Sequence, residues 1–204
     1  MRQSLAEPLI EHICYRGRKY KLKPSFGRVI TCYETLQNEA FDSFDKVDMC
    51  LKLLVKNKIR LYFMSTEKKA ELFELIFNQI IKVNKGKSGA TKAFDFLQDS
   101  QYIYAGFMQC YKIDLMQCRD TLHWWQFMSL FSCLSEDTRM AQIISVRTKP
   151  IPKATKYNAD ERLKLIRLKQ EYMLEMSDEE RNANLQQGLA KMAAALGGMI
   201  KRKT

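Results

Sequence analysis

The stretch DTLHWWQFMSLFSCL, residues 120–134, constrains the fold more than any other part of the chain. On an α-helix its apolar side chains would surround nearly the whole circumference, interrupted only by Gln126, Ser129 and Ser132. A helix that is apolar all round is normally buried. The stretch therefore predicts a core helix against which other helices pack. The predicted core residues are His123, Trp124, Trp125, Phe127 and Phe131.

The composition favours helices over a large sheet. Four prolines and eight glycines leave little for the turns of many strands, whereas eleven methionines and abundant leucine, lysine and glutamine favour helices. Hydrophobic residues make up 46% of the 204, enough to build a core. We expect a mainly α fold: a compact helical domain with a small N-terminal β-hairpin and a C-terminal helical extension.

The hairpin is predicted between Leu9 and Lys23. Two short runs flank Arg16-Gly17-Arg18, where glycine can adopt the positive φ that a tight turn needs. Pro24 ends the hairpin, and Ser25 is placed to cap the first helix.

Apolar residues at helical spacing predict the remaining elements. The predicted helices span residues 26–36, 44–55, 66–82, 95–111, 114–134, 136–146, 159–176 and 177–197. Asp95, Ser135 and Asn158 are predicted as helix caps, with Gln98 at the capping-box position after Asp95.

Residues 147–157, RTKPIPKATKY, are predicted to form a linker because they carry two prolines, four basic residues and no apolar periodicity. They would separate a helical domain, 1–146, from basic C-terminal helices, 158–204. In that second part, apolar residues recur at steps of four and three, as along one seam of a coiled coil. This seam could dock on the protein's own core, self-associate or capture a partner, or lie on a membrane surface. The predicted partner-binding residues are Leu185, Leu189, Met192, Leu196 and Met199.

No pattern indicates catalysis or a cofactor. His123 has Cys118 and Cys133 at offsets that turn them away from it on a helix. Gly86-Lys87-Ser88 resembles a phosphate loop, but Ile81 stands where the motif needs its first glycine. His12 and Cys14 lack a second ligand pair at zinc spacing. We therefore expect no catalytic residue, no metal site and no enzyme activity.

The cysteines and the hydropathy indicate the compartment. The six cysteines contain no C-x-x-C pair, and the N-terminus has no apolar run of the signal-peptide kind, so free thiols in a reducing cytoplasm are expected. No apolar stretch approaches the roughly 18 residues of a membrane span.

A net charge of +11 raises nucleic acid, an anionic membrane or an acidic protein as partner. The hairpin carries the best candidate patch for nucleic acid, because its basic residues alternate with Tyr15 and Tyr20. The same pattern is typical of a solvated hairpin face. The candidate contacts are Arg16, Arg18, Lys19 and Lys21.

Several segments resemble the bacteriophage gene-product-fifteen family of tailed phages and prophages. They are EPL at 7–9, IYAGFMQCYKIDL at 103–115, LHWWQFMSLFSCLSEDT at 122–138 and RLKQEYML at 167–174. The resemblance implies a small, mainly helical, non-enzymatic phage protein similar to tail assembly chaperones. Such chaperones coat the elongated, aggregation-prone tape-measure protein until tail-tube subunits replace them.

We therefore expect a tail assembly chaperone that acts in the host bacterial cytoplasm without a cofactor. It would bind the tape-measure protein or other tail proteins through apolar surface and self-associate along the client. Two alternatives belong to other classes: a basic nucleic-acid-binding or packaging accessory protein, and a structural virion protein of the tail or of head completion.

Overall fold

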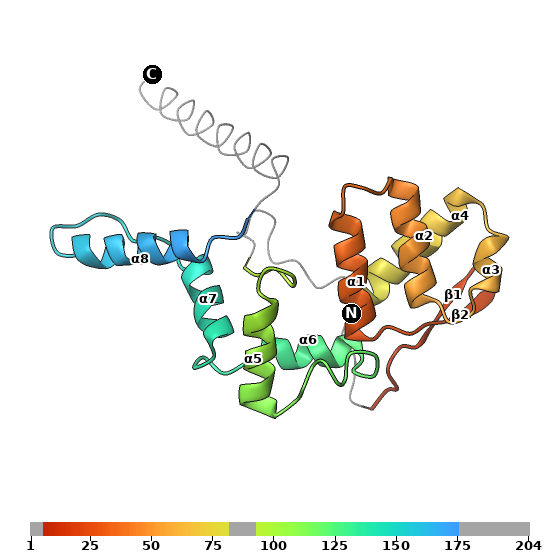
Figure 1. Cartoon of the computed structure of the whole chain (residues 1–204), viewed down its shortest axis with the longest axis horizontal. Helices are drawn as coiled ribbons and strands as arrows, with labels where there is room; N and C mark the ends of the chain where they lie inside the picture. The colour runs from red at the N-terminus through yellow and green to blue at the C-terminus, as the bar shows by residue number, and fades with distance from the viewer. Residues whose placement is uncertain (1–5, 82–92, 176–204) are drawn as a thin grey trace, which may run out of the picture.

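The structure, a computed structural model, describes residues 6–81 and 93–175 (Figure 1). Two strands, β1 (His12–Tyr15) and β2 (Arg18–Lys21), precede a series of helices. These are α1 (Phe26–Gln37), α2 (Ser43–Leu54), α3 (Ile59–Tyr62), α4 (Thr66–Ile76) with the π-helical turn η1 (Phe77–Ile81), α5 (Ser100–Tyr111), α6 (Trp124–Ser132), α7 (Arg139–Thr148) and α8 (Ala159–Glu171). The predicted mainly α fold with an N-terminal hairpin is confirmed.

The helices form a body with a projecting arm (Figure 1). The hairpin and α1–α4 make one end of the body, where α1 packs on α2 and α2 on α4. Helix α6 contacts α1 and η1 on one side and α5 on the other, and so connects the hairpin and α1–α4 to α5. Helices α7 and α8 extend from α5 toward the opposite end, with α3 at the far side of the molecule. We call α7 and α8 the arm.

The hairpin closes through a two-residue turn in which Arg16 (φ 49°) and Gly17 (φ 72°) both have positive φ. Ile13 pairs with Tyr20, and both side chains are buried. Beyond the two-stranded sheet, Leu22 forms an isolated antiparallel bridge with Val55, just after α2. The hairpin is thereby tied to the helical body.

Aromatic rings from distant segments meet on α6. Phe127 stacks on Phe26 with 4.8 Å between ring centroids and on Phe107 with 5.1 Å. Trp124 stacks on Phe127 at 5.5 Å and donates a hydrogen bond from Nε1 to the Ile81 carbonyl at 3.2 Å. Because the buried residues of α6 recur every three or four positions, one face of the helix carries the centre of the core.

The prediction of one continuous helix over 114–134 is wrong, because residues 115–122 form turns and α6 begins at Trp124. Backbone pairing with a distant segment imposes the break. The Trp124 N–H donates to the Pro24 carbonyl at 2.7 Å, and the Phe26 N–H donates to the Leu122 carbonyl at 2.9 Å. His123 between them has extended backbone and caps α6.

The predicted caps also act differently from expectation. Asp95 accepts N–H bonds from Leu97 and Gln98 and so caps a turn, and α5 begins only at Ser100. Thr138, not Ser135, caps α7. Asn158 precedes α8, but its side-chain oxygen accepts the N–H of Thr155. Ser25 precedes α1 without a capping bond from its hydroxyl.

A buried ion pair fastens the arm to the body. Arg147 was assigned to the linker, but α7 continues through Thr148. The guanidinium of Arg147 donates hydrogen bonds to both carboxylate oxygens of Asp99, at 2.6 and 2.8 Å, and to the carbonyl of Tyr172 at 2.6 Å. Gln98 adds two bonds to the backbone of Glu175, at 2.8 and 2.9 Å. The arm is therefore held to the turn before α5 at two neighbouring points.

Replacing Gly27 by alanine is expected to destabilise the fold by about 1–3 kcal/mol, the usual cost of overpacking. A Cβ there would lie 2.3 Å from Arg119 Cγ and 2.8 Å from the Arg119 carbonyl oxygen, so backbone as well as side chain would have to move. Gly106, in α5, is the matched control, because its nearest neighbour would be the flexible end of Leu134 at 3.3 Å. Alanine there should be neutral or gain up to about 1 kcal/mol of helix propensity. Urea unfolding of both variants measures the difference, and equal effects would contradict the close packing at Gly27.

Candidate interaction surfaces

His123 is a structural residue in this fold. Its Nδ1 accepts the Trp125 N–H at 3.1 Å, and its Nε2 lies 3.3 Å from the Ile10 carbonyl. Its own N–H donates to Gln126 Oε1 at 3.2 Å, completing a capping box. Burial lowers the pKa of His123, which favours the neutral ring that this arrangement requires. Both ring nitrogens therefore have structural partners.

The remaining residues of the predicted block divide between two faces. Trp124, Phe127 and Phe131 are buried, whereas Trp125 is half buried. The expectation that apolar residues all round α6 would be equally enclosed thus does not hold for Trp125.

The four candidate nucleic-acid contacts do not form one patch. Arg16 pairs with Glu71 of α4 at 2.9 Å, and hydrogen bonds from the Tyr15 hydroxyl and the Arg16 guanidinium lower the pKa of Glu71. Arg18 is opposite Tyr15 in the hairpin. Lys19 and Lys21 lie on the outer face, because the intervening Tyr20 points into the core.

A row of lysines continues this outer face. The bridge between the buried residues Leu22 and Val55 turns their neighbours Lys21, Lys23 and Lys56 outward. Two backbone bonds fix the register: Lys56 N–H to the Lys21 carbonyl at 2.9 Å, and Lys23 N–H to the Leu54 carbonyl at 2.7 Å. We call Lys19, Lys21, Lys23 and Lys56 the basic strip. Sequence reasoning missed Lys56, because only this pairing brings it beside β2.

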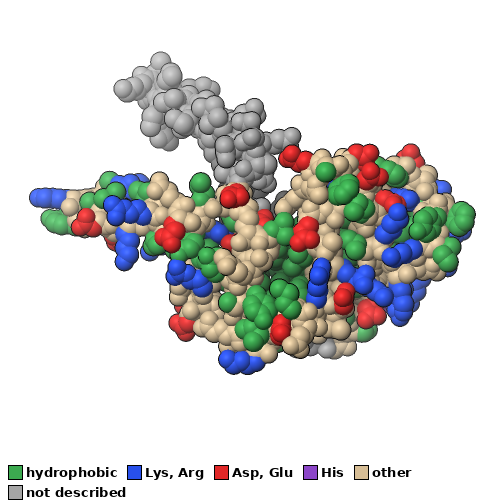
Figure 2. Space-filling model, in the orientation of Figure 1, with side chains coloured by type: hydrophobic (Ala, Val, Ile, Leu, Met, Phe, Trp, Pro, Cys, Tyr) green, Lys and Arg blue, Asp and Glu red, His purple; other side chains and the backbone are tan. Residues whose placement is uncertain are grey.

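An apolar ridge lies next to the basic strip. Ile59, Tyr62 and Phe63 are 67%, 68% and 87% exposed, although each is large and hydrophobic. Ile59 and Tyr62 are positions i and i+3 of α3, and Phe63 is the C-cap residue that follows, so the three exposed side chains lie within about one helical turn. We call these three residues the α3 ridge. Figure 2 shows hydrophobic side chains gathered at this end of the molecule, with basic ones beside them.

The predicted coiled-coil seam, Leu185 to Met199, lies outside the described residues. The arm has exposed apolar side chains of its own, but they are spread over two loops and α8. They are Ile151, Tyr157, Leu163 and Met173.

Comparison with known families decides the relationship of the chain. A family model described as Bacteriophage Gp15 protein matches residues 5–174, most of the sequence. The chain belongs to the bacteriophage Gp15 protein family. The match includes the basic strip, the α3 ridge and the arm, and it ends before the predicted seam. No curated protein and no solved structure matches this Gp15 family member.

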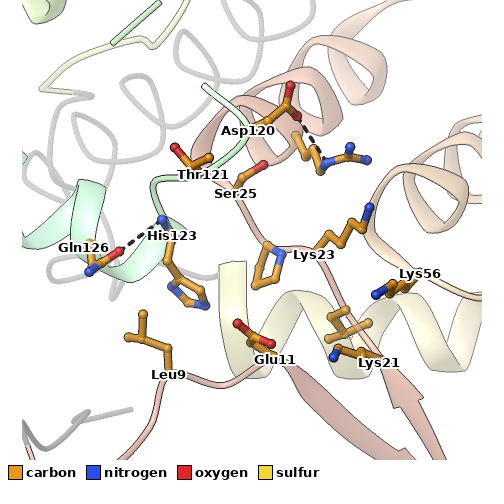
Figure 3. A pocket seen from close by; sticks show the side chains of 13 residues that line it. Leu9, Glu11, Lys21, Lys23, Ser25, Lys56, Asp120, Thr121, His123 and Gln126 are labelled. Atoms are coloured by element: carbon orange, nitrogen blue, oxygen red, sulfur yellow. Dashed lines mark hydrogen bonds and ion pairs between the residues drawn. The ribbon is translucent and has the colours of Figure 1, made fainter. Parts of the chain in front are cut away.

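A pocket of about 400 Å³ opens beside the basic strip in this Gp15 family member (Figure 3). Lys21, Lys23 and Lys56 line one side, and His123 and Gln126 line the opposite side. Its acidic residues are Glu11 and Asp120, and Asp120 is 3.4 Å from Arg28. The buried Ser25 hydroxyl in its lining has no hydrogen-bond partner within the described parts of the chain.

Across residues 6–81 and 93–175, no three His, Cys, Asp or Glu side chains are grouped so that they could hold a metal ion. In the same ranges no helix has the length and apolar character needed to cross a bilayer. The described surface carries exposed apolar side chains on the α3 ridge and positive charge along the basic strip.

Proposed function

We propose that this phage protein is a tail assembly chaperone that binds apolar helix faces of the tape-measure protein through the α3 ridge. The exposure of Ile59, Tyr62 and Phe63 carries the proposal. A contiguous apolar surface at the end of a folded protein promotes association unless a partner covers it. The spacing of the three residues suits an amphipathic partner helix, which presents its own apolar stripe in the same way.

The mechanism is coverage without bond making. Each copy buries an apolar segment of the client and so keeps client chains from associating with one another. Exposed methionines such as Met116 and Met173 supply flexible contacts that can adapt to an irregular partner. Self-association, through the predicted seam from Leu185 to Met199, would extend this coverage along a long client in the host cytoplasm.

Phe63→Ser should reduce the solubility of the tape-measure protein when the two are co-expressed, and should reduce their co-purification. Burying one aromatic side chain contributes about 1.5–3 kcal/mol, so its removal should weaken binding by roughly 10- to 100-fold. The measurement is the soluble fraction of the tape-measure protein when it is co-expressed with the wild type and with the variant. The fold should be unaffected, because Phe63 is 87% exposed.

Tyr157→Ser is the matched control, since it removes an aromatic ring that is 92% exposed but lies on the arm. It should leave the client soluble. If the client is equally soluble with and without this protein and no complex co-purifies, the chaperone proposal fails. If the protein is found in purified particles, the structural virion alternative is favoured instead.

The basic strip supports a second candidate function, a nucleic-acid-binding accessory protein. Its four lysines have no ion pair with any described residue, so they are free to neutralise phosphates. Such binding would weaken steeply as salt is raised and would be lost when the lysines are neutralised.

A further inference from the structure

The basic strip and the α3 ridge form one continuous surface. Lys56 is three residues before Ile59, and the Asn57 side chain accepts the Ile59 N–H at 3.2 Å, which fixes the start of α3. Arg60 Nη1 donates to the Lys19 carbonyl at 3.2 Å, joining α3 directly to β2. A partner that covers the ridge therefore has the basic strip along its border.

This border carries unbalanced positive charge. Lys19 and Lys21 of β2 and Lys23 just after it alternate at about 6.6–6.8 Å per two residues of extended chain, and Lys56 adds a fourth beside them. The neighbouring acidic groups compensate only in part, since Asp120 is 3.4 Å from Arg28 and Asp48 pairs with Lys52 at 2.6 Å. Glu11 is the remaining carboxylate of the adjoining pocket.

We propose that this composite surface recognises an amphipathic helix whose apolar stripe is bordered by glutamate or aspartate. The inference rests on the proposed function in using the α3 ridge as the contact, and it adds the charge that the partner must carry. Complementary charge at the rim of an apolar contact speeds encounter and excludes partners of like charge. A helix bordered by lysine would place like charges against the basic strip.

The composition of the ridge favours a protein helix over a nucleic acid. Bases stack on planar aromatic or guanidinium groups. Tyr62 and Phe63 offer such faces, but Ile59, the third residue of the ridge, does not. Apolar side chains at i and i+3 of α3, with a third at its C-cap, match the way in which one helix packs on another. Single-stranded DNA is therefore the competing ligand that the experiment must include.

The test uses the full chain and two synthetic helical peptides of about 20 residues, a length at which isolated helices can form. Both have the same leucine stripe, which is bordered by glutamate in one and by lysine in the other. Fluorescence anisotropy should show at least tenfold tighter binding of the glutamate peptide at low salt. The preference should shrink near 1 M salt, where the screening length is about 3 Å.

A charge-reversed variant tests the basic strip itself. Lys21→Glu/Lys23→Glu/Lys56→Glu should reverse the preference toward the lysine peptide. The matched control, Lys149→Glu/Lys153→Glu/Lys164→Glu, changes the net charge equally at exposed positions on and next to the arm, and should keep the glutamate preference. Phe63→Ser should weaken both peptides.

Equal binding of the two peptides, no binding of either, or the same response from both triple variants would overturn the inference. An oligothymidylate serves as the single-stranded DNA competitor. The inference would also be overturned if this oligothymidylate binds through the basic strip and displaces the glutamate peptide from the Phe63→Ser variant. If the glutamate peptide binds as expected but the tape-measure protein stays insoluble, only the proposed function fails. If the tape-measure protein depends on Phe63 but not on the basic strip, only this inference fails.

Discussion

Trp124→Ala is expected to lower the free energy of unfolding by about 3–5 kcal/mol, the range for removing a buried large aromatic side chain. Trp124 is 2% exposed, stacks on Phe127 and packs edge-on against Phe96 at 5.5 Å. Its removal would leave a cavity at the junction of α6 and η1, and would leave the Ile81 carbonyl without its indole donor. Urea denaturation followed by tyrosine fluorescence and circular dichroism measures the loss.

Trp125→Ala is the internal control, because it removes the same side chain at the next position of the same helix. Trp125 is only partly buried, so its loss should cost less. Equal losses at both positions would mean that α6 is enclosed on all sides, as its composition alone predicts. An unchanged stability for Trp124→Ala would remove α6 from the centre of the core.

Arg147→Ala is expected to destabilise the protein by about 3–5 kcal/mol, because it leaves a buried carboxylate without its cation. The side chains of Arg147 and Asp99 are 8% and 2% exposed. The same guanidinium also bonds the carbonyls of Ala93 and Tyr172, so its loss removes partners from three segments. The measurement is chemical denaturation, combined with amide hydrogen exchange in α8.

Arg16→Ala provides the comparison, since it removes an arginine whose ion pair with Glu71 is half exposed. Exposed pairs contribute about 0–1 kcal/mol, so this variant should be close to wild type. If backbone amides exchange faster only in α8 of Arg147→Ala, the ion pair stabilises the docking of the arm and not the rest of the fold. Wild-type stability and exchange in Arg147→Ala would show that it is dispensable for docking.

Local patterns in the sequence predict the elements that local interactions determine. The hairpin is predicted correctly because a glycine-containing turn between two short runs is a local signal, and both turn residues do adopt positive φ. The break before α6 could not be predicted, because bonds to Pro24 and Phe26, far away in the sequence, impose it. Asp95 is predicted to begin a helix, and its local bonds from Leu97 and Gln98 instead cap a turn that precedes α5.

The candidate surface was only partly predictable for the same reason. Lys19 and Lys21 could be placed on the hairpin, but Lys56 joins them through a strand register that no local pattern encodes. The α3 ridge was missed because the sequence pattern predicts no helix between residues 55 and 66, and only the tertiary structure shows that Ile59, Tyr62 and Phe63 are exposed. The prolines after Arg147 predict a linker there, and no local pattern indicates that Arg147 lies in the last turn of α7 and pairs with Asp99.

The pairing of Ser25 with His123 also determines when the fold can be completed during synthesis. These residues are roughly 100 positions apart and meet in a backbone bridge, a contact of high sequence separation that forms late. At about 5–20 residues per second, the ribosome needs roughly 5–20 seconds to make the intervening chain. During that interval the nascent helix α1 has neither Phe127 against Phe26 nor the backbone partners that hold its first turn. The newly made N-terminal half thus passes through a period of exposed core surface before α6 emerges to cover it.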